Sequence, residues 1–549
     1  MLCILHAWLL EGSGSNLWTR SVVRSLCRRG ETVHLVCQEN HPERYDFIGT
    51  AITYGLDGST RTALSRATPY SGQCVLHKPE LGDTLPVFVW DKYEEYARVV
   101  PMVDLHTDEI ESYVNRNVEV VKRIVEDHGV TVIHANHAVM MPVVAQRIDR
   151  ALDVPFTVMP HGSDIEYAVR KDPRFLAYAG SALEAARKVF VIGEEMRSRV
   201  LDVFAGVPRV ADKLSALHLG VDTSEFELIP RAERMKEIRN LLRSLEELPK
   251  GKSHAQERTY DRELGRVHTT SQLTQLVQRS SAYDGKRPDA SAGTKLEAIP
   301  WTTAPTLLFV GRLIAWKGIQ SLIAALPPVL AKEPELRVLV VGHGPLREAM
   351  EAFVWALRHE DRAMIEAIVD EGRAIDGSAQ EDQSLADVKD FYAKLKERGG
   401  TEAYFAQARL CVREDSVVFT GYLTHNELQH LFPCCDVGVF PSVVREAGPL
   451  VFLEALASGC FPLGTYFGGM AASIDAVGEE LPGDVAEIMK LDPANTVEEL
   501  TRKIPLALAA APTYRETLSR VARERYDWSS VSEKFMREIS AIERSVATR

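Results

Sequence analysis

Short apolar runs alternate with helix-patterned stretches along most of this chain of 549 residues. The runs are rich in Val, Leu, Ile and Phe and end at Gly, Pro or polar residues, which is typical of strands buried in a parallel sheet. Strands that alternate with helices predict parallel sheets with crossover helices, and such sheets bind ligands at the carboxyl ends of their strands. The sequence therefore predicts an α/β protein with two doubly wound, Rossmann-like units. We expect strands in MLCILHAW, TVHLVCQ, VTVIHA, PFTVMPH and KVFVIG in the first half, and in TLLFVGR, LRVLVVGHG, SVVFTGY and DVGVFPS in the second.

Two charged stretches interrupt this alternation and indicate the domain limits. We interpret residues 1–227 as a first domain and residues 304–529 as a second. Residues 228–303, dense in Arg, Glu, Lys, Ser and Gln, are predicted to be a charged insertion that is helical and in part mobile. Residues 351–413 are predicted to be a helical insertion in the second domain. Solvated accessory helices are the simplest interpretation of both insertions, and binding of a partner is the alternative.

Composition and charge exclude several classes of function. The net charge of −13 argues against a general nucleic-acid binder or a protein that binds anionic membranes. No apolar run approaches the length needed to cross a bilayer, and the first ten residues lack the basic flank and cleavage site of a signal peptide. The eight cysteines are scattered without a C-x-x-C pair, so we expect reduced thiols, a cytoplasmic location and no zinc motif.

The segment PSVVREAGPLVFLEALASG, residues 441–459, places one glutamate before a helix and one inside it. A Gly-Pro pair suits a helix start, so Glu446 lies just before the helix and Glu454 lies within it. The first amides of this helix, at Leu450 and Val451, lack intrahelical partners and favour an anion. Two carboxylates with an anion site between them suit a ligand with hydroxyl groups at both ends and phosphate in the middle, such as a sugar nucleotide.

Two cations follow the first strand of the second half. In FVGRLIAWKG, Arg312 comes directly after the strand and Lys317 five residues later, where a helix begins. Such a pair can clamp a diphosphate, with Arg as a fork and Lys as a point charge. Two ordinary surface cations are the alternative. The next strand ends in VVGHGPLR, where Gly342 and Gly344 allow the backbone to approach a ligand closely.

Taken in order, these segments resemble the retaining glycosyltransferases of the GT-B fold, family 4. VGRLIAWKG, VVGHGPLR, VVFTGYL and REAGPLVFLEALASGCFPLGTYFGG resemble the C-terminal domain of that family, with Glu446 and Glu454 as its E-x7-E pair. PHGSDIEYA and HLGVDTSEF resemble its N-domain histidine motif and interdomain segment, and YDWSSVSEKF resembles its final helices. The resemblance implies two Rossmann-like domains that face each other across a cleft. The first domain, completed by a helix at about 530–549, would bind the acceptor and the second the donor.

The resemblance also implies roles for individual residues. Arg312 and Lys317 would hold the donor diphosphate and stabilise it as it leaves. His161 would reach the sugar beside its anomeric carbon, and Glu446 would face the donor sugar as a positioning and electrostatic group. The remaining implied donor-binding residues are Gly12, Gly14 and Ser15 of the first loop, Gly421, Tyr422 and Leu423 near the base, Gly448, Pro449, Leu450 and Val451 near sugar and phosphate, and Glu454 on the ribose hydroxyls.

The implied reaction moves a sugar from a nucleoside-diphosphate sugar to an acceptor, with retention of the anomeric configuration. UDP-sugars are the first candidate donors. The acceptor is a small molecule, a glycan or a lipid-linked molecule, and no nucleic-acid partner is expected. Cations and a helix N-terminus can stabilise the leaving diphosphate, so we expect no metal or other cofactor, in agreement with the lack of a D-x-D pattern. A GT-B sugar phosphorylase, a nucleotide-sugar epimerase and a non-catalytic sugar-nucleotide binding protein are the alternatives. Oligomeric state and peripheral membrane association stay open.

Three further features have competing interpretations. His134 and His137 have the i, i+3 spacing of a metal pair, but no acidic or Cys partner lies nearby, so we interpret them as structural or cleft-wall residues. The EGSGSN loop, with Glu39 after the second strand, is similar to a dinucleotide fingerprint. Leu17 stands where its third glycine belongs, which argues against an NAD-dependent dehydrogenase. His161 could also be a loop residue that caps the next helix.

Overall fold

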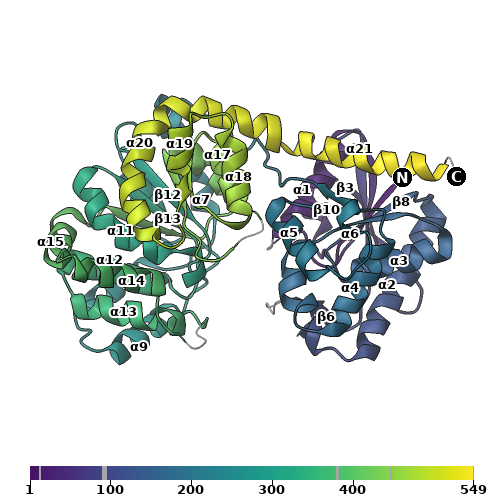
Figure 1. Cartoon of the computed structure of the whole chain (residues 1–549), viewed down its shortest axis with the longest axis horizontal. Helices are drawn as coiled ribbons and strands as arrows, with labels where there is room; N and C mark the ends of the chain where they lie inside the picture. The colour runs from purple at the N-terminus through teal and green to yellow at the C-terminus, as the bar shows by residue number, and fades with distance from the viewer. Residues whose placement is uncertain (12–13, 89–95, 379–381, 446–447, 449, 548–549) are drawn as a thin grey trace. The chain divides into compact units, whose positions relative to one another are not determined.

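Two compact units make up the protein, whose structure is a computed structural model of the whole chain. The structure describes all residues except 12–13, 89–95, 379–381, 446–447, 449 and 548–549. The first unit comprises Met1–Gly220 and Arg525–Arg549, and the second comprises Val221–Glu524. Each unit contains a parallel sheet with its own helices around it (Figure 1). The predicted α/β class with two parallel-sheet units is confirmed.

The first unit is built on a nine-stranded sheet with the order β11-β10-β9-β8-β1-β2-β5-β3-β4. Its described neighbours pair in parallel except β3 and β4, which are antiparallel. The strands are β1 (Leu2–Leu5), β2 (Thr32–Val36), β3 (Ile48–Tyr54), β4 (Thr60–Ser65), β5 (Gln73–Pro79), β8 (Val132–Asn136), β9 (Phe156–Met159), β10 (Lys188–Val191) and β11 (Leu214–Ala216), and a separate pair is formed by β6 (Thr84–Val87) and β7 (Arg98–Pro101). The helices are α1 (Gly14–Arg28), α2 (Thr107–His128), α3 (Met141–Leu152), α4 (Pro173–Ala185), α5 (Glu194–Val203), α6 (Val210–Lys213) and α21 (Trp528–Ala547).

The last helix returns to the first unit and packs along its first helix. In Figure 1 this helix, α21, is the yellow helix beside α1. Ser25 of α1 donates to the backbone oxygen of Trp528 at 3.0 Å and contacts the hydroxyl of Ser532 at 2.8 Å. The ring of Trp528 also covers Gly220, where a Cβ would lie only 2.5 Å from it. A glycine is therefore needed at this position for the helix to dock.

The second unit has a six-stranded sheet in which all neighbours are parallel, with the order β14-β13-β12-β15-β16-β17. Numbered along the chain, this is the 3-2-1-4-5-6 order of the Rossmann fold. The strands are β12 (Thr306–Val310), β13 (Arg337–Val341), β14 (Val417–Gly421), β15 (Val437–Phe440), β16 (Phe461–Thr465) and β17 (Lys490–Leu491). The helices are α7 (Arg234–Glu247), α8 (His254–Leu264), α9 (Thr270–Ser280), α10 (Ala292–Glu297), α11 (Ile319–Lys332), α12 (Arg347–His359), α13 (Arg362–Ile375), α14 (Ala386–Glu397), α15 (Thr401–Cys411), α16 (His425–Leu431), α17 (Leu450–Ala457), α18 (Gly468–Gly478), α19 (Gly483–Met489) and α20 (Thr496–Val521).

Each sheet has a switch point, where the chain stops adding strands on one side and continues on the other. In the first unit it lies between β1 and β8, and in the second between β12 and β15. Loops that follow these strands diverge and leave a crevice at the carboxyl edge, where open α/β sheets bind their ligands. The fold alone therefore directs attention to the loops after β1, β8, β12 and β15.

The two charged insertions are helical and carry many exposed charged side chains, as expected of solvated helices, but a few of their charged side chains are buried. Arg234 and Lys252 of the first insertion are fully buried. The guanidinium group of Arg234 donates to Asp436 at 2.6 Å, and Lys252 pairs with Glu348 at 3.5 Å. Helix α9 packs against α12 and α13, so the two insertions contact each other. The sequence predicted helices here correctly, but charge density did not reveal which of the charged side chains are buried. Among the described helices, none has both the length and the apolar character needed to cross a bilayer.

Candidate functional site

The loop after β12 and the loop after β15 meet at the switch point of the second unit. The backbone N–H of Val443 donates to the oxygen of Trp316 at 3.0 Å. Gly318 has φ +74°, and a Cβ there would lie 1.8 Å from the oxygen of Pro441. Only a glycine allows this approach, because it lacks a side chain and adopts positive φ without strain. The sequence segment that carries both predicted cations is thus joined to the segment that leads into α17.

Both predicted cations lie in the first of these loops. Arg312 is exposed, two residues after the end of β12, and no ion pair joins it to a described residue. Lys317 is half-buried and ends a short 3-10 turn, Ala315–Lys317, directly before α11. Of the opposite loop, Gly448 is described, and Leu450 and Val451 begin α17. Glu446 and Pro449 lie outside the described residues.

The next two strands end in loops that lie against the first one. The backbone N–H of Leu313 donates to the oxygen of His343 at 2.7 Å, and Gly342 donates to Gly421 at 2.9 Å. A Cβ at Gly342 would lie 1.9 Å from the oxygen of Gly311, so its glycine allows the β12 and β13 loops to touch. Gly421 is the last residue of β14, and Tyr422 and Leu423 follow it, as expected of a segment at a strand end. Four loops therefore form one continuous edge.

Glu454 is buried in α17 and has one unsatisfied carboxylate oxygen. Its Oε1 lies 2.9 Å from Nδ1 of His425, the first residue of α16. Its Oε2 is buried and has no hydrogen-bond partner among the described residues. A buried acceptor without a donor is costly, and such a group at a ligand site is often completed by the ligand. Because α16 follows the Gly421–Leu423 segment directly, Glu454 lies beside the segment that the resemblance assigns to the base.

The first insertion covers the Gly421 segment. Pro288 forms an isolated bridge with Gly421, and the N–H of Tyr422 donates to the oxygen of Arg287 at 3.2 Å. The following residue, Asp289, is fully buried and receives two hydrogen bonds from the guanidinium group of Arg347, at 2.9 and 2.5 Å. Arg347 begins α12, just after the glycine-rich β13 loop. This bidentate ion pair holds the insertion against the strand-end loops.

Two carboxylates of the second insertion accept hydrogen bonds from the residues around Lys317. The carboxylate of Asp376, directly after α13, accepts a hydrogen bond from the N–H of Ala315 at 2.8 Å. The carboxylate of Asp387, in α14, accepts from the hydroxyl of Ser321 and from the carboxamide of Gln320. Burial raises the pKa of Asp387, although these donors lower it. The second insertion thus fixes both the turn before Lys317 and the first turn of α11.

In the first unit, His161 lies after β9 and is held by a chain of hydrogen bonds. Its Nε2 is 2.7 Å from Oδ1 of Asn136, the last residue of β8. The amide of Asn136 donates in turn to the hydroxyl of Thr19 at 3.2 Å. Burial lowers the pKa of His161 well below its usual range, so the ring is neutral at pH 7. Since Nε2 donates to Asn136, Nδ1 is the nitrogen that can accept a proton or a hydrogen bond.

Asp164 fixes the backbone on which His161 lies. Its buried carboxylate accepts from the N–H groups of Gly162 at 2.7 Å, of Ala138 at 2.5 Å and of His161 at 3.3 Å. Burial raises the pKa of Asp164, although these amides lower it. The competing interpretation of His161 as a helix cap does not fit, because the capping carboxylate belongs to Asp164 and the His161 side chain points to Asn136.

His137 follows β8 and lies at the switch point of the first unit. It has φ +70°, is fully buried, and its ring is tilted by 53° relative to that of His161, with ring centroids 4.8 Å apart. Neither ring nitrogen has a hydrogen-bond partner among the described residues, and Nδ1 is 4.0 Å from the carboxylate of Asp164. Trp8, in the loop after β1, packs edge-on against the same ring at 4.7 Å. His137 therefore joins the candidate site, as a cleft-wall residue with unsatisfied nitrogens.

Two other sequence features have structural roles. His134 is buried in β8 and its Nδ1 contacts the hydroxyl of Thr157 at 2.8 Å, which supports the structural interpretation. The carboxylate of Glu39 is occupied by the N–H groups of Leu10 at 3.1 Å and His41 at 2.8 Å. It is therefore not available to bind a ribose, in keeping with the interpretation against a dehydrogenase. Gly14 and Ser15 form the first turn of α1, and Gly12 lies outside the described residues.

Comparison with known proteins agrees with this arrangement. Residues 12–225 match the family model of Glycosyltransferase Family 4, and residues 304–370 and 385–505 match that of Glycosyl transferases group 1. The two matches follow one another in chain order and together cover most of the sequence. The chain belongs to the GT-B glycosyltransferases.

Relatives and solved structures are similar to this glycosyltransferase at low identity. A 2-deoxystreptamine glucosyltransferase of Streptomyces kanamyceticus is 26% identical over 212 residues, which are 37% of this chain and 40% of the relative. A sulfoquinovosyl transferase of Arabidopsis thaliana is 24% identical over 43% of this chain and 33% of its own length. The matched stretches thus span less than half of these relatives. Sucrose-phosphate synthase from Thermosynechococcus elongatus has a TM-score of 0.54 at 15% identity, covering 99% of both chains, and HepE from Anabaena in complex with UDP has 0.51 at 13% identity, covering 98% of this chain and 99% of its own. These structures share its fold.

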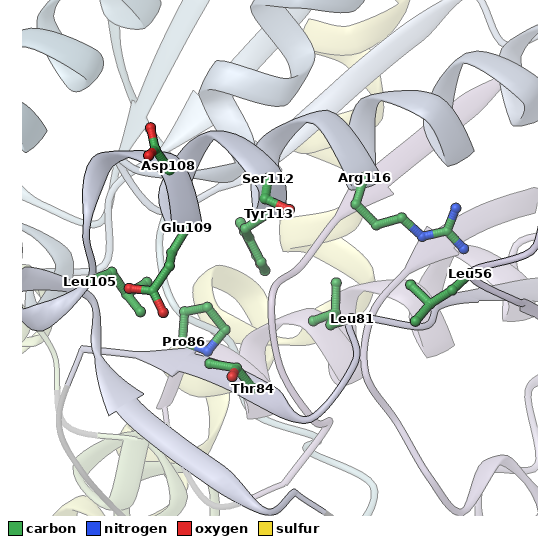
Figure 2. Close-up of a pocket in the computed structure, with 10 residues that line it drawn as sticks. All are labelled: Leu56, Leu81, Thr84, Pro86, Leu105, Asp108, Glu109, Ser112, Tyr113 and Arg116. Atoms are coloured by element: carbon green, nitrogen blue, oxygen red, sulfur yellow. The ribbon is translucent and has the colours of Figure 1, made fainter.

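The first unit of this glycosyltransferase also contains a pocket of about 410 Å³ at the carboxyl ends of β3 and β5. Figure 2 shows α2 passing along one side of the pocket, with the loops after β3 and β5 opposite. The guanidinium group of Arg116 is occupied by the oxygens of Tyr54, Gly55 and Glu80, and Glu109 pairs with Arg98. The walls are therefore mainly apolar and internally paired. The lining residues are Leu56, Leu81, Thr84, Pro86, Leu105, Asp108, Glu109, Ser112, Tyr113 and Arg116.

Sequence reasoning missed the residues that hold the predicted ones. Asn136 and His425 contact His161 and Glu454, yet neither belongs to the quoted motifs; Asp164 lies in the histidine motif PHGSDIEYA but was assigned no role. Asn136 and His425 follow or end near predicted strands, so a search of all strand ends for polar residues could have found them. Asp376 carried no such signal, because it lies in the charged insertion.

Proposed function

We propose that this chain is a retaining glycosyltransferase that moves a sugar from a nucleoside-diphosphate sugar to an acceptor. UDP-sugars are the first candidate donors, and the reaction needs no metal ion. The observation that carries this proposal is the edge of four joined loops in the second unit. There the loop with Arg312 and Lys317 is hydrogen-bonded to the loop that enters α17, and Glu454 keeps a buried, unsatisfied oxygen.

Each group of the second unit has a task in this reaction. When the bond between the anomeric carbon and the phosphate oxygen breaks, negative charge grows on the departing diphosphate and positive charge on the sugar ring. Lys317 and Arg312 supply positive charge to the diphosphate, and the unpaired amides that begin α17 add to it. Glu454 accepts hydrogen bonds from ribose hydroxyl groups through its free Oε2. The joined loops keep these groups in place before the reaction starts, so that little reorganisation is needed.

The first unit contributes groups that stay neutral. His161, held by Asn136 through Nε2, offers Nδ1 to a sugar hydroxyl beside the anomeric carbon. A neutral ring suits this task, because an imidazolium would oppose the positive charge that develops on the sugar. The buried ring of His137 packs beside it, and neither of its nitrogens has a hydrogen-bond partner among the described residues.

Ligand binding and turnover test this function separately. Nucleoside diphosphates and their sugars are screened by thermal shift, with and without EDTA, and UDP at 100 times its Kd is expected to stabilise the protein by about 2.7 kcal/mol. Lys317→Ala and Arg312→Ala should each lower kcat by about 100- to 1,000-fold, the cost of one lost transition-state contact. Lys332→Ala is the matched control, because this exposed lysine ends α11, the helix that follows the Lys317 turn, and lies outside the four loops.

The alternatives give different results in the same assays. An epimerase converts the nucleotide sugar without an acceptor, a phosphorylase requires phosphate, and a sensor binds the nucleotide without turnover. NMR of the product reports the anomeric configuration. Normal turnover in Lys317→Ala and Arg312→Ala would remove the assignment of the donor site.

We further propose that the acceptor binds in the first unit, in the pocket between α2 and the ends of β3 and β5. The backbone oxygen of Pro86 in the pocket wall accepts from the indole N–H of Trp8 at 2.8 Å, and Trp8 packs on His137. The pocket is thereby connected to the His161 group. Filling it with Ser112→Trp should raise KM for small-molecule, glycan or lipid acceptors and leave the UDP thermal shift unchanged.

A further inference from the structure

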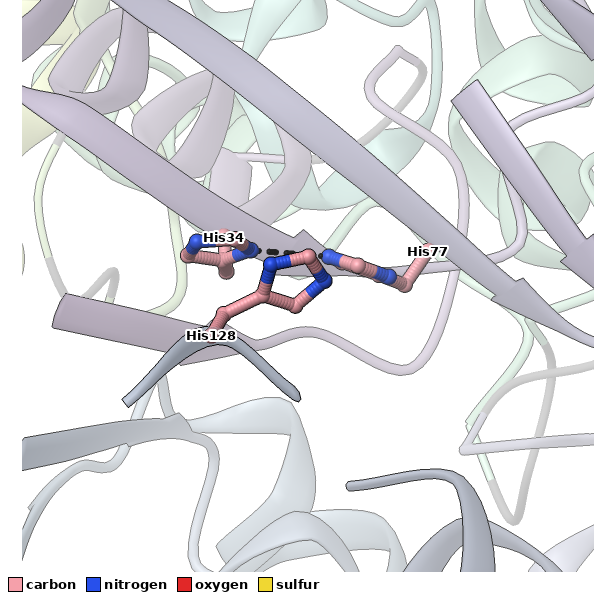
Figure 3. A group of neighbouring side chains, drawn as sticks. All are labelled: His34, His77 and His128. Atoms are coloured by element: carbon pink, nitrogen blue, oxygen red, sulfur yellow. Dashed lines mark hydrogen bonds between the residues drawn. The ribbon is translucent and has the colours of Figure 1, made fainter. Parts of the chain in front are cut away.

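Three histidines from distant parts of the sequence converge inside the first unit. His34 lies in β2, His77 in β5, and His128 is the last residue of α2. His34 and His77 are buried, with 2% and 0% of their surfaces exposed, and His128 is half-buried. Figure 3 shows the His128 ring facing the hydrogen-bonded pair of His34 and His77. The cluster lies in the body of the strands and not among the loops at their carboxyl ends.

The spacing of the three rings is close to that of a metal centre. Nδ1 of His34 and Nε2 of His77 are 2.9 Å apart, and one nitrogen from each of the three histidines lies within 4.8 Å of the others. Zinc binds imidazole nitrogens at about 2.0–2.1 Å in a tetrahedron, which places two such nitrogens about 3.3 Å apart. Small rotations of the rings bring all three to this distance. The exposed side of His128 leaves an entry path.

The outward nitrogens of the two buried rings already have partners. Nδ1 of His77 is 2.8 Å from the hydroxyl of Tyr54, and Nε2 of His34 is 3.1 Å from the sulfur of Met1. A metal-binding histidine needs such an outer contact, which orients the ring and sets its tautomer. The inward nitrogens face each other directly. Without a cation between them, one of these two must carry a hydrogen.

We propose that His34, His77 and His128 bind one divalent transition-metal ion, with zinc as the expected occupant and water as a fourth ligand. Imidazole ligands suit Zn²⁺, Co²⁺, Ni²⁺ and Cu²⁺ and do not suit Mg²⁺. The ion joins β2 and β5 to the end of α2, so its role is to stabilise the first unit. It takes no part in the metal-free transfer proposed for the donor loops.

The protonation state of the two buried rings also suits a metal ligand. Burial lowers the pKa of His34 to about 4 and that of His77 well below its usual range, so both rings are neutral and have lone pairs at pH 7. The residues are 43 and 51 positions apart, which explains why no spacing motif predicted a metal here. The sequence expectation of no zinc rested on the cysteines alone.

Zinc binding to the full-length protein tests the proposal. The protein is treated with EDTA, dialysed, and titrated with Zn²⁺ or Mg²⁺ by calorimetry and thermal shift, and Co²⁺ is followed by its visible absorption. We expect one Zn²⁺ per chain, a higher Tm with Zn²⁺, and no effect of Mg²⁺. Tyr54→Phe should weaken zinc binding by about 10- to 100-fold, because it removes the outer partner of His77. His128→Asn, at the more exposed ligand, should weaken it at least as much.

The matched control is His359→Asn. Like His128, His359 is the last residue of its helix, α12, but it is exposed and lies in the second unit. It should bind zinc as the unchanged protein does. The UDP thermal shift should be the same in all four proteins, so that failure here is distinguishable from failure of the donor site. A hydrogen-bonded cluster without metal affinity would show no stoichiometric zinc. That result, or equal zinc affinity in His128→Asn and the unchanged protein, would overturn the proposal.

Discussion

Residues 228–303 and residues 351–413 both add charged helices to the second unit, yet they contact the strand-end loops through different chemistry. At these loops the first insertion uses a buried ion pair, Asp289 with Arg347. A second buried pair, Arg234 with Asp436, holds the insertion at the opposite edge of the sheet, where β12 and β15 begin. The second uses carboxylates that accept hydrogen bonds from uncharged donors, as Asp376 and Asp387 do. The first insertion contacts the Gly421 segment, and the second contacts the turn before Lys317.

This difference predicts unequal consequences of mutation. A buried ion pair that loses one partner leaves an uncompensated charge in a region without water, which costs several kcal/mol. A hydrogen bond between a carboxylate and an amide costs about 1–3 kcal/mol when it is lost. The first insertion should therefore matter more for folding, and the second more for the placement of Lys317.

Arg347→Met should have the largest effect. It leaves Asp289 buried without its guanidinium partner and should lower the free energy of unfolding by about 3–5 kcal/mol, measured by urea denaturation. The variant that still folds should also bind UDP more weakly, since Asp289 anchors the segment against Gly421.

Arg358→Met is the matched control for this experiment. Arg358 lies in the same helix α12, and its partner Glu414 is 90% exposed at 3.8 Å. Such a pair contributes about 0–1 kcal/mol. Equal losses in the free energy of unfolding of Arg347→Met and Arg358→Met would show that the buried ion pair stabilises the protein no more than the exposed one does.

The main lines of the fold could be predicted from the sequence. All nine expected strands are present, because continuous apolar runs bounded by Gly and Pro mark strands buried on both faces. Strands β3–β7, β11, β16 and β17 were not predicted. Among them, the side chains of β4 are mostly exposed, and β16 contains Pro462. Neither strand shows the apolar run on which the prediction depended.

The position of the residues that we assign to the donor could also be predicted, because Arg312, Lys317 and Glu454 lie at strand ends or in a helix that follows one. The support of these loops could not. Asp289 and Arg347 are 58 residues apart, and Lys252 and Glu351 are 99 apart. Charge density looks the same in a solvated helix and in one whose charges pair across the core, and only the fold decides which of the two occurs.

Replacing the hydrogen-bonded Asp387 and the ion-paired Asp436 should change the pH dependence of the free energy of unfolding in opposite directions. The pKa of Asp387 is raised from 3.8, mainly by burial, so the folded state holds this proton more tightly than the unfolded state. Wild-type stability is therefore lost as pH rises from 3.8 through the folded pKa, at up to about 1.4 kcal/mol per pH unit. Asp387→Asn lacks this loss, so its free energy of unfolding should rise relative to that of the wild type over this pH interval. Urea denaturation at a series of pH values measures the difference.

Asp436 provides the opposite case. Burial raises the pKa of Asp436, but Arg234 outweighs this and the net pKa lies below 3.8. The stability that the Asp436 carboxylate contributes is present above pH 3.8 and is lost as pH falls through the folded pKa. The free energy of unfolding of Asp436→Asn should therefore fall relative to that of the wild type as pH rises to 3.8. The same sign in both variants would contradict the distinction between ion-paired and neutral support.

Asp376→Ala should have the smallest effect on stability and the most local one on function. It removes the acceptor for the N–H of Ala315 and should cost about 1 kcal/mol, while KM for the nucleotide sugar rises because the turn before Lys317 loses its support. The matched control is Asp370→Ala in α13, the helix that ends just before Asp376, where the carboxylate and its partner Lys389 are both 56% exposed. If Asp376 only stabilised the insertion, both variants would leave KM unchanged. A rise in KM confined to Asp376→Ala, with kcat less affected, is the result that ties the second insertion to the diphosphate loop.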